Sequence, residues 1–170
     1  SRRYADVNDV LEISKDENSI KELKLEKFNL TACINDILKR YSKLKESDGY
    51  NLIFENTEDV FVNADNLKIT QVIYNLINNA LTYTGDDKVI KIRQSVIDDI
   101  VKIEIIDTGD GINLDEIDYI WDRYYKAKGN HKRAQIGTGL GLAIVKNILI
   151  MHNADFGVKN EENGGNRVFA

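Results

Sequence analysis

The sequence predicts an α+β fold, a two-layer sandwich in which three helices cover one face of a mixed, mainly antiparallel sheet. Segments with helical spacing of apolar residues are interleaved with short segments in which polar and apolar residues alternate. Only Asp98 and Asp99 separate two β-rich segments, 89–97 and 100–106, as in an antiparallel hairpin. Helices interleaved with hairpin strands are typical of two-layer α+β domains.

The first part of the chain is expected to hold two helices and three strands. Residues 2–14 have helical spacing, and residues 20–30 alternate as a strand does. Thr31 is a residue type that can cap the next helix. The apolar face of that helix consists of Ile34, Ile37, Leu38, Tyr41 and Leu44. Short strands near 51–54 and 60–62 follow.

A longer central helix is expected to begin at Asp65 or Asn66 and to end at Gly85 and Asp86. Its apolar positions recur at helical spacing and are Leu67, Ile69, Val72, Ile73, Leu76, Ile77, Ala80 and Leu81. After the hairpin, the expected elements are a short helix near 114–120, a last helix over 140–152, and strands near 155–160 and 167–170. The chain ends within an apolar run, so we expect the natural protein to continue.

The composition indicates a soluble globular domain. With 170 residues, of which 42% are hydrophobic and 30% charged, the chain can bury a sizeable core. No apolar run approaches the ~20 residues that cross a bilayer. A formal net charge of −5 does not favour nonspecific nucleic-acid binding. The single cysteine, Cys33, excludes an internal disulfide and is expected to be a small core residue.

Basic residues are concentrated in one short segment of this otherwise acidic chain, and the segment has no hydrophobic periodicity. They are Arg123, Lys126, Lys128, Lys132 and Arg133. The segment is either a solvated, mobile loop or a flexible basic flap over an anionic ligand, and both descriptions can hold together. Its position between two glycine clusters favours the flap.

These two glycine clusters are the most informative feature of the chain. Asp107-Thr108-Gly109-Asp110-Gly111 follows an apolar strand, and Gly137-Thr138-Gly139-Leu140-Gly141-Leu142 precedes the last helix. Glycine allows the backbone to approach a neighbour closely or to adopt a positive φ angle. A strand that ends at such a cluster and a helix that begins at one are both suited to binding a nucleotide.

A polar stripe runs along the central helix beside its apolar face. It consists of Gln71, Asn75, Asn79 and Thr82, at spacings of four, four and three residues. Because asparagine is a mediocre helix former, two at this spacing indicate either an ordinary solvated face or a ligand. The glycine clusters favour a ligand, and the amide oxygen of asparagine is suited to Mg²⁺ that also binds phosphates.

Four segments, in this order, resemble the motifs of sensor histidine kinases. Asn75-Leu76-Ile77-Asn78-Asn79-Ala80, with Tyr83-Thr84 after it, resembles the N box, and 107–112 resembles the first glycine box. Ile120-Trp121-Asp122-Arg123-Tyr124-Tyr125-Lys126 resembles the F box, and 137–145 resembles the second glycine box. Together they are specific for the histidine-kinase branch of the Bergerat-fold ATPases, which also includes gyrase B, Hsp90 and MutL. The resemblance implies the Bergerat form of the two-layer fold.

The resemblance also implies a site for ATP and Mg²⁺. Asp107 would accept a hydrogen bond from the adenine amino group, although an aspartate at this place can also cap a turn. Asn79 would hold Mg²⁺, and Asn75 would support the metal–phosphate end as a catalytic residue. Tyr83 would line the pocket, or only pack beside it. The other implied nucleotide-binding residues are Gly109, Gly111, Ile112, Gly137, Thr138, Gly139, Leu140 and Gly141.

Two basic residues of the presumed flap are implied to be catalytic. Arg123 and Lys126 would approach the terminal phosphate, because phosphoryl transfer depends chiefly on positioning and charge neutralisation. For each of them a surface charge without that role is an equal alternative. Three places depart from the family pattern: Thr82 stands where Lys is common, Trp121 where Phe is common, and Asn153-Ala154 where Gly-Gly is common. The loss of the Lys cation would weaken contacts with phosphate.

The resemblance implies the ATP-binding catalytic domain of a two-component sensor histidine kinase. It would transfer the γ-phosphate to a histidine on a separate dimerisation domain, for relay to a response regulator. The two histidines of this chain, His131 and His152, lack the context of that phosphoacceptor. Residues 1–19 would be the remnant of the dimerisation hairpin's second helix plus linker, and 20–170 the catalytic domain. We expect a monomeric, cytoplasmic fragment of a homodimeric, membrane-anchored bacterial parent that does not bind nucleic acid.

Other functions fit part of the pattern. A nucleotide-binding regulatory module without kinase activity is supported by Thr82. A Bergerat-type ATPase usually has a glutamate in the N box to activate water, whereas this chain has Asn75 at the equivalent position, so hydrolysis is expected to be slow. A serine-directed kinase of the same fold fits the F box less well.

Overall fold

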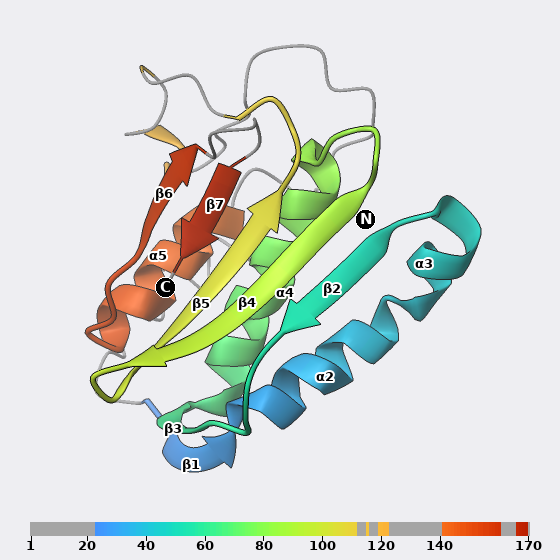
Figure 1. Cartoon of the computed structure of the whole chain (residues 1–170). Coiled ribbons are helices and arrows are strands. Elements are labelled where there is room, and N and C mark those ends of the chain that lie inside the picture. Colours follow the sequence, from blue (N-terminus) through green and yellow to red (C-terminus); the bar gives the residue numbers. More distant parts are fainter. Residues whose placement is uncertain (1–22, 112–114, 116–118, 123–140, 161–165, 170) are drawn as a thin grey trace, which may run out of the picture.

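A β-sheet and a layer of helices make up most of the structure (Figure 1). The structure is a computed structural model that describes residues 23–111, 115, 119–122, 141–160 and 166–169. Within this part of the chain the main sheet has five strands, in the order β2-β4-β5-β7-β6. They are β2 (Asn51–Glu55), β4 (Val89–Ile97), β5 (Ile100–Asp107), β7 (Asn166–Phe169) and β6 (Gly157–Asn160). β2 is parallel to β4, and the other neighbouring pairs are antiparallel.

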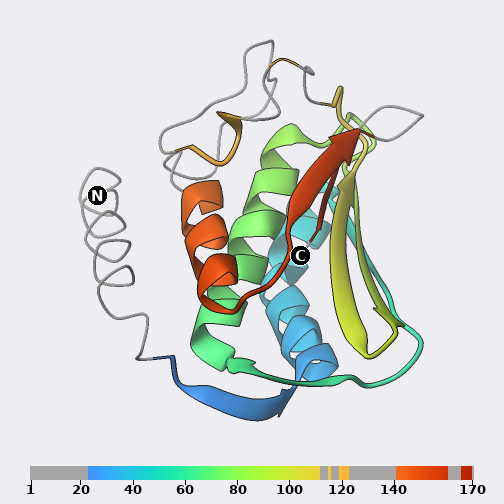
Figure 2. The same ribbon diagram turned by 90° about the vertical axis from the view of Figure 1, so that its left-hand side faces the viewer.

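Three helices cover one face of this sheet, as the turned view shows (Figure 2). They are α2 (Leu30–Arg40), α4 (Asn66–Tyr83) and α5 (Gly141–Met151), and the short α3 (Ser42–Asp48) follows α2. Aliphatic side chains from both layers form the core between them, and the most deeply buried include Ile34, Ile77, Ile90, Ile105 and Ile148. The predicted α+β two-layer sandwich with a mixed, mainly antiparallel sheet is therefore confirmed.

A second, smaller pair of strands lies outside the main sheet. β1 (Leu25–Asn29) and β3 (Phe61–Asp65) pair with each other as an antiparallel ribbon. The sequence predicts a strand in both places, although the observed bounds differ by a few residues. Because α2 begins directly after β1 and α4 directly after β3, this ribbon fixes where both helices start.

The two long helices of this region begin at side-chain caps, but one cap differs from the prediction. Asp65 caps α4, which begins at Asn66, one of the two predicted starts, and Oδ1 of Asp65 accepts a hydrogen bond of 3.2 Å from the backbone N–H of Lys68. The N-cap of α2 is Asn29 rather than Thr31, so that prediction is wrong. The helix starts earlier because β1 runs directly into it. Thr31 is instead buried, and its hydroxyl accepts hydrogen bonds from Val60 N–H and from the amide of Gln94.

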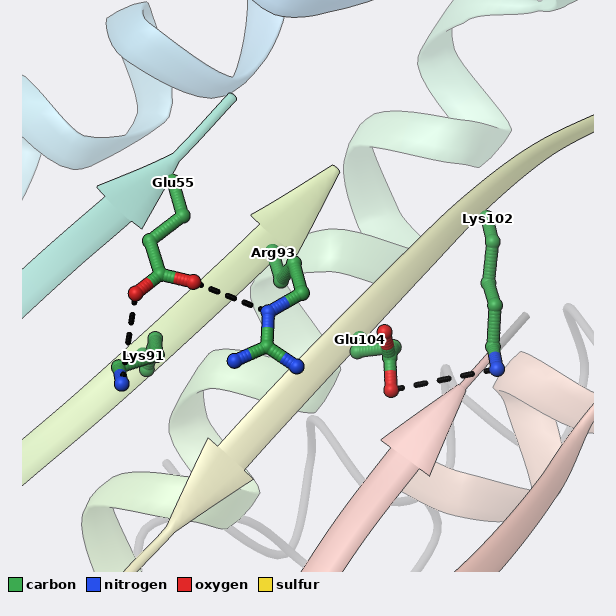
Figure 3. A network of polar contacts seen from close by, with 5 residues as sticks. All are labelled: Glu55, Lys91, Arg93, Lys102 and Glu104. Atoms are coloured by element: carbon green, nitrogen blue, oxygen red, sulfur yellow. Dashed lines mark hydrogen bonds and ion pairs between the residues drawn. The ribbon is translucent and has the colours of Figure 1, made fainter. Parts of the chain in front are cut away.

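The face of the sheet turned away from the helices carries charged side chains (Figure 3). On it Glu55 accepts a hydrogen bond of 2.9 Å from Nε of Arg93 and lies 3.3 Å from Nζ of Lys91. The hydrogen bond from Arg93, with the ammonium of Lys91 beside it, lowers the pKa of the Glu55 carboxyl below its ordinary value. On β5, Nζ of Lys102 lies 4.0 Å from the carboxylate of Glu104, two residues along the same strand. This open face is therefore an ion-paired surface.

The seam between α2 and α4 is more polar than the rest of the core. Cys33 is half-buried there, with its sulfur 3.4 Å from the hydroxyl of Thr70, so it packs against the core rather than within it. The hydroxyl of Tyr41 donates a hydrogen bond of 2.8 Å to the Asn78 side chain. Burial, and then the neighbouring Tyr74, raise the pKa of Tyr41. Among the helices that the structure describes, none is long and apolar enough to cross a membrane.

Candidate functional site

The carboxyl ends of β5 and α4 meet at the first glycine cluster. A Cβ atom on Gly109 would lie 1.9 Å from the carbonyl oxygen of Tyr83, and a Cβ on Gly85 would lie 2.6 Å from that of Thr108. No side chain fits into either place without movement of the backbone. The two glycines therefore let the turn after β5 lie directly on the last residues of α4, and Gly111 adds a turn with a φ angle of +83°.

Two threonines connect this turn to the end of α4. The buried hydroxyl of Thr84 donates a hydrogen bond of 2.7 Å to the carbonyl of Val89, and it lies 3.2 Å from the hydroxyl of Thr108. The Thr108 hydroxyl also accepts a hydrogen bond of 3.2 Å from Gly85 N–H and bonds to the carboxylate of Asp87. This network fixes the glycine turn on α4 by hydrogen bonds as well as by contact.

Asp107 is the last residue of β5, and its side chain is buried. Its Oδ1 accepts a hydrogen bond of 2.9 Å from the backbone N–H of Gly109. One carboxylate oxygen of Asp107 thus caps the turn, which is one of the two roles that the sequence left open for this residue. The contact also fixes the orientation of the carboxylate, because the N–H that holds it belongs to the residue that is packed against Tyr83.

Two asparagines of α4, Asn75 and Asn79, precede Tyr83 in the helix, and both are half-buried. A Cβ on Gly141, the first residue of α5, would lie 3.8 Å from the side chain of Asn75, so the start of α5 contacts this asparagine. Nδ2 of Asn75 is buried and has no hydrogen-bond partner among the described residues. The side chain of Asn79 makes no hydrogen bond to another described residue. A buried amide without a partner is costly, and it indicates a place where a ligand can complete the bonding.

The remaining residues of the predicted polar stripe lie in different surroundings. Thr82 is buried, and its hydroxyl donates a hydrogen bond of 3.1 Å to the carbonyl of Asn78 one turn earlier. Gln71 of the stripe is half-buried, as is Tyr83, which lies beside the stripe. The stripe is therefore not one continuous solvated face. The ligand-binding roles predicted for Asn75 and Asn79 stay predictions, and Thr82 contributes to the helix itself.

Part of the predicted site lies outside the described residues. These residues are Ile112, Arg123, Lys126, Gly137, Thr138, Gly139 and Leu140. Of the F box, the structure describes the beginning: Ile120 is buried, and the ring of Trp121 packs edge-on against Phe156 with centroids 5.0 Å apart. Tryptophan at this position thus anchors the chain to the core two residues before Arg123, as the commoner phenylalanine could.

The departure at Asn153-Ala154 has a clear physical explanation. Asn153 follows α5 with a φ angle of +54°, in the left-handed region that glycine usually occupies at a helix end. Its N–H donates to the Ile150 carbonyl, and the N–H of Ala154 donates to that of Leu149. These are the two hydrogen bonds of a Schellman motif. Asparagine is the residue type that best replaces glycine here, so the helix ends in the same way.

Sequence reasoning missed the Thr84–Thr108 network and the second contact glycine. Gly85 was expected only to end the central helix, and Thr84 only as part of a motif. The signal was present, because a Thr-Gly pair directly after a helix and a threonine within a glycine cluster both supply short polar groups to close backbone contacts. Among the described residues, no three His, Cys, Asp or Glu side chains gather as a metal site. The amide oxygen of Asn79, which accepts no hydrogen bond from the part of the chain that the structure describes, fits a metal that takes its other ligands from phosphates and water.

One family model matches this arrangement. The model for histidine kinase-, DNA gyrase B- and HSP90-like ATPases matches residues 64–170, which include α4, the glycine turn and α5. The chain belongs to the family of histidine kinase-, DNA gyrase B- and HSP90-like ATPases. The particular member that it resembles is the ATP-binding domain of a sensor histidine kinase, as the four sequence motifs predict.

Named relatives and solved structures agree with this. The sensor protein kinase WalK of Staphylococcus saprophyticus is 33% identical over 165 residues, which cover 96% of this chain and 27% of the relative. WalK of Staphylococcus aureus is 34% identical over 166 residues, covering 96% of this chain and 40% of the relative. The chain therefore spans less than half the length of the curated relatives that it matches.

Among solved structures, the nucleotide-free catalytic domain of the histidine kinase ThkA has a TM-score of 0.75 and 28% identity, covering 86% of this chain and 93% of that domain. Full-length ShkA in complex with AMPPNP has a TM-score of 0.79 over 97% of this chain and 34% of ShkA, at 23% identity. The first comparison supports the histidine-kinase assignment, and the second shows the shared fold.

Proposed function

We propose that this domain binds Mg-ATP between the glycine turn after β5 and the asparagines of α4, and that it donates the γ-phosphate to a histidine on a separate dimerisation domain. The observation that carries the proposal is the buried Nδ2 of Asn75, which has no hydrogen-bond partner among the described residues and lies where α4 meets the start of α5. A buried donor costs about 1–3 kcal/mol when it lacks a partner, and an anionic phosphate supplies one.

The adenine end of the site would be formed by Asp107. Its carboxylate is buried and oriented by the Gly109 N–H, so it can accept a hydrogen bond from the adenine amino group in a fixed direction. Because an ionised carboxylate can only accept hydrogen bonds, it selects a base that presents an amino group. The turn lies directly on α4 and thereby places this contact at a constant distance from the asparagines.

The phosphate end would be formed by the N box and by the residues before α5. Asn79 would hold Mg²⁺ through its amide oxygen, and the metal supplies charge neutralisation at the phosphates. The backbone N–H groups of 137–141, before and at the start of α5, would bind phosphate oxygens. Arg123 and Lys126 would neutralise charge at the γ-phosphate during transfer.

The proposed reaction is a transfer of one phosphoryl group. A nitrogen of the acceptor imidazole forms a bond to the γ-phosphorus as the bond from that phosphorus to the bridging oxygen of ADP breaks. ADP leaves with the electron pair, and the acceptor imidazole loses its N–H proton to the surrounding water. We propose that the acceptor lies on the dimerisation domain of the same homodimeric, membrane-anchored parent, from which a response regulator then takes the phosphate.

Binding of the non-hydrolysable analogue AMPPNP, measured by calorimetry with and without Mg²⁺, tests the site. Asp107→Asn should weaken binding by about tenfold or more, as expected when a hydrogen bond to a charged group is lost. Asn79→Ala should remove most of the dependence on Mg²⁺. The matched control is Asp110→Asn, because Asp110 is an exposed carboxylate in the same turn and should bind like the wild type. Equal loss in Asp107→Asn and Asp110→Asn would contradict the assignment.

Adding a dimerisation hairpin that carries the histidine then distinguishes a kinase from a module that only binds the nucleotide. Labelled phosphate on the supplied histidine supports transfer. Binding of AMPPNP without such labelling would support the regulatory module, and brisk release of phosphate without the hairpin would support an ATPase. Stable labelling of His131 or His152 in the isolated domain would overturn the proposed separate acceptor.

A further inference from the structure

A histidine at the end of α5 joins three segments of the chain, and none of the proposed catalytic steps uses it. Nδ1 of His152 lies 2.8 Å from the carbonyl oxygen of Ile148 in the last turn of α5. Nε2 lies 3.1 Å from the backbone nitrogen of Asp65, the residue before α4. A carbonyl can only accept and a backbone N–H can only donate, so in this arrangement Nδ1 donates to Ile148 and Nε2 accepts from Asp65.

Asp65 extends this connection to the beginning of the described chain. Its Oδ1 caps α4 at Lys68, and its Oδ2 accepts a hydrogen bond of 3.1 Å from the backbone N–H of Lys24, directly before β1. The side chain of Asp65 is buried. The end of α5, the start of α4 and the approach to β1 are therefore held together by two adjacent hydrogen-bonded residues, Asp65 and His152.

The opposite end of the same pair of helices is the proposed phosphate site. α4 and α5 lie side by side in both views (Figures 1 and 2) and are in contact with each other. At the far end Gly141 lies against Asn75. Both helices also contribute buried aliphatic residues, among them Val72 of α4 and Val145 and Ile148 of α5, to one core cluster. Such contacts are non-directional, so they allow small shifts of one helix along the other.

We propose that His152 is a positioning residue for the nucleotide site, because its directional hydrogen bond to Asp65 fixes α5 along α4. That fixed position sets the spacing between Asn75 and the start of α5, about one helix length away from the histidine. A misplacement of about 1 Å at a reacting group can cost a hundredfold in rate, so a fixed spacing of these helices has a direct functional value. The proposal rests on the proposed function of the site.

Two substitutions at His152 test it. His152→Leu keeps the bulk of the side chain and removes both hydrogen bonds, whereas His152→Gln keeps one acceptor and one donor. The matched control is Ile150→Ala, in the same last turn, because Ile150 is half exposed at 49%. We expect His152→Leu to weaken AMPPNP binding by about tenfold, the effect of one lost hydrogen bond with a buried donor left unpaired, and His152→Gln to restore most of it.

Hydrogen exchange of the nucleotide-free domain supplies a readout that does not depend on binding. His152→Leu should speed exchange at Asp65 N–H and also at residues 141–144, at the far end of α5. Faster exchange confined to the last turn of α5 would show a local structural role and overturn the proposal. So would equal weakening of AMPPNP binding in His152→Leu and Ile150→Ala. If the wild type itself does not bind AMPPNP, the proposed function fails, and exchange at 141–144 alone decides whether His152 positions α5.

Discussion

The two ends of α4 are held in place by different means. At its start Asp65 accepts hydrogen bonds from Lys24 and Lys68 and donates its own N–H to His152. At its end the backbone itself is in contact, with Gly109 against Tyr83 and Gly85 against Thr108. The first arrangement consists of hydrogen bonds made by two side chains, whereas the second is a close contact of the backbone itself. The start of α4 is thus held by side-chain hydrogen bonds, whereas its second half carries Asn75 and Asn79, which we propose to bind the ligand.

The largest effect is expected from a side chain at the tightest contact. Gly109→Ala would place a Cβ 1.9 Å from the Tyr83 carbonyl, so the turn must leave α4. We expect a loss of about 3 kcal/mol in the free energy of unfolding, at the upper end for overpacked sites, and loss of AMPPNP binding. Urea unfolding and calorimetry measure the two. Asp110→Ala, at the exposed neighbour, is the control. A Gly109→Ala domain with wild-type stability would show that the backbone contact is unimportant.

A smaller effect is expected from the threonine network. Thr84→Val keeps the shape of the side chain and leaves the carbonyl of Val89 without its hydrogen bond. We expect a loss of about 1–2 kcal/mol in the free energy of unfolding, because Thr84 is buried. Thr57→Val, at an exposed threonine, should change little and is measured in the same urea series. If both variants unfold alike, hydrogen bonds do not fix the carboxyl end of α4.

Asn153 tests the other end of α4, because it directly follows His152, which accepts a hydrogen bond from Asp65 at the start of that helix. Its φ angle of +54° is unfavourable for most side chains, so Asn153→Ala should lose about 1 kcal/mol in the free energy of unfolding. Asn153→Gly, the residue that is common in the family, should match the wild type within a few tenths, about the noise of the measurement. Chemical denaturation of both variants checks this. Destabilisation by glycine but not by alanine would contradict the helix-end geometry described above.

The smallest effect is expected on the open face of the sheet. This face is turned away from the helices, so it serves as a reference for both ends of α4. The pKa of Glu55 is lowered by Arg93 and Lys91, so the ionised form is favoured in the folded state. The stabilisation is therefore complete above the ordinary value of 4.5 and is lost as the pH falls through the lowered value. Glu55→Gln should unfold slightly more easily at pH 7 and like the wild type at low pH. A difference that grows as the pH falls would contradict this sign.

The sequence predicted the layers of the fold well, because the signals are local. Helical spacing of apolar residues predicted α4 and α5, and Asp98-Asp99 predicted the hairpin of β4 and β5. Both aspartates have positive φ angles in this turn. The cap of α2 was misassigned to Thr31, since its hydroxyl is used by Val60 and Gln94, 29 and 63 residues away. Such contacts arise from the tertiary structure and leave no local pattern.

The candidate site was predictable from its motifs, but its connections were not. Asp107, Asn75 and Asn79 are named by the motifs, and the structure places each at the end or along one face of the expected element. The contact of Gly109 with Tyr83 and the bond from Asp65 to His152 join residues that are far apart in sequence. Glycine and histidine are compatible with many roles, so only the arrangement in space distinguishes a contact point from a turn or a surface residue.

Amide hydrogen exchange with and without Mg-AMPPNP tests the central claim most directly, because it reports on both ends of α4 in one experiment. The account predicts the strongest protection at residues 107–111, together with 75–85. It predicts a much smaller change at 65–68, where the hydrogen bonds are already formed in the free domain. Strong protection at 65–68 with none at 107–111 would contradict the placement of the nucleotide, whatever the affinity.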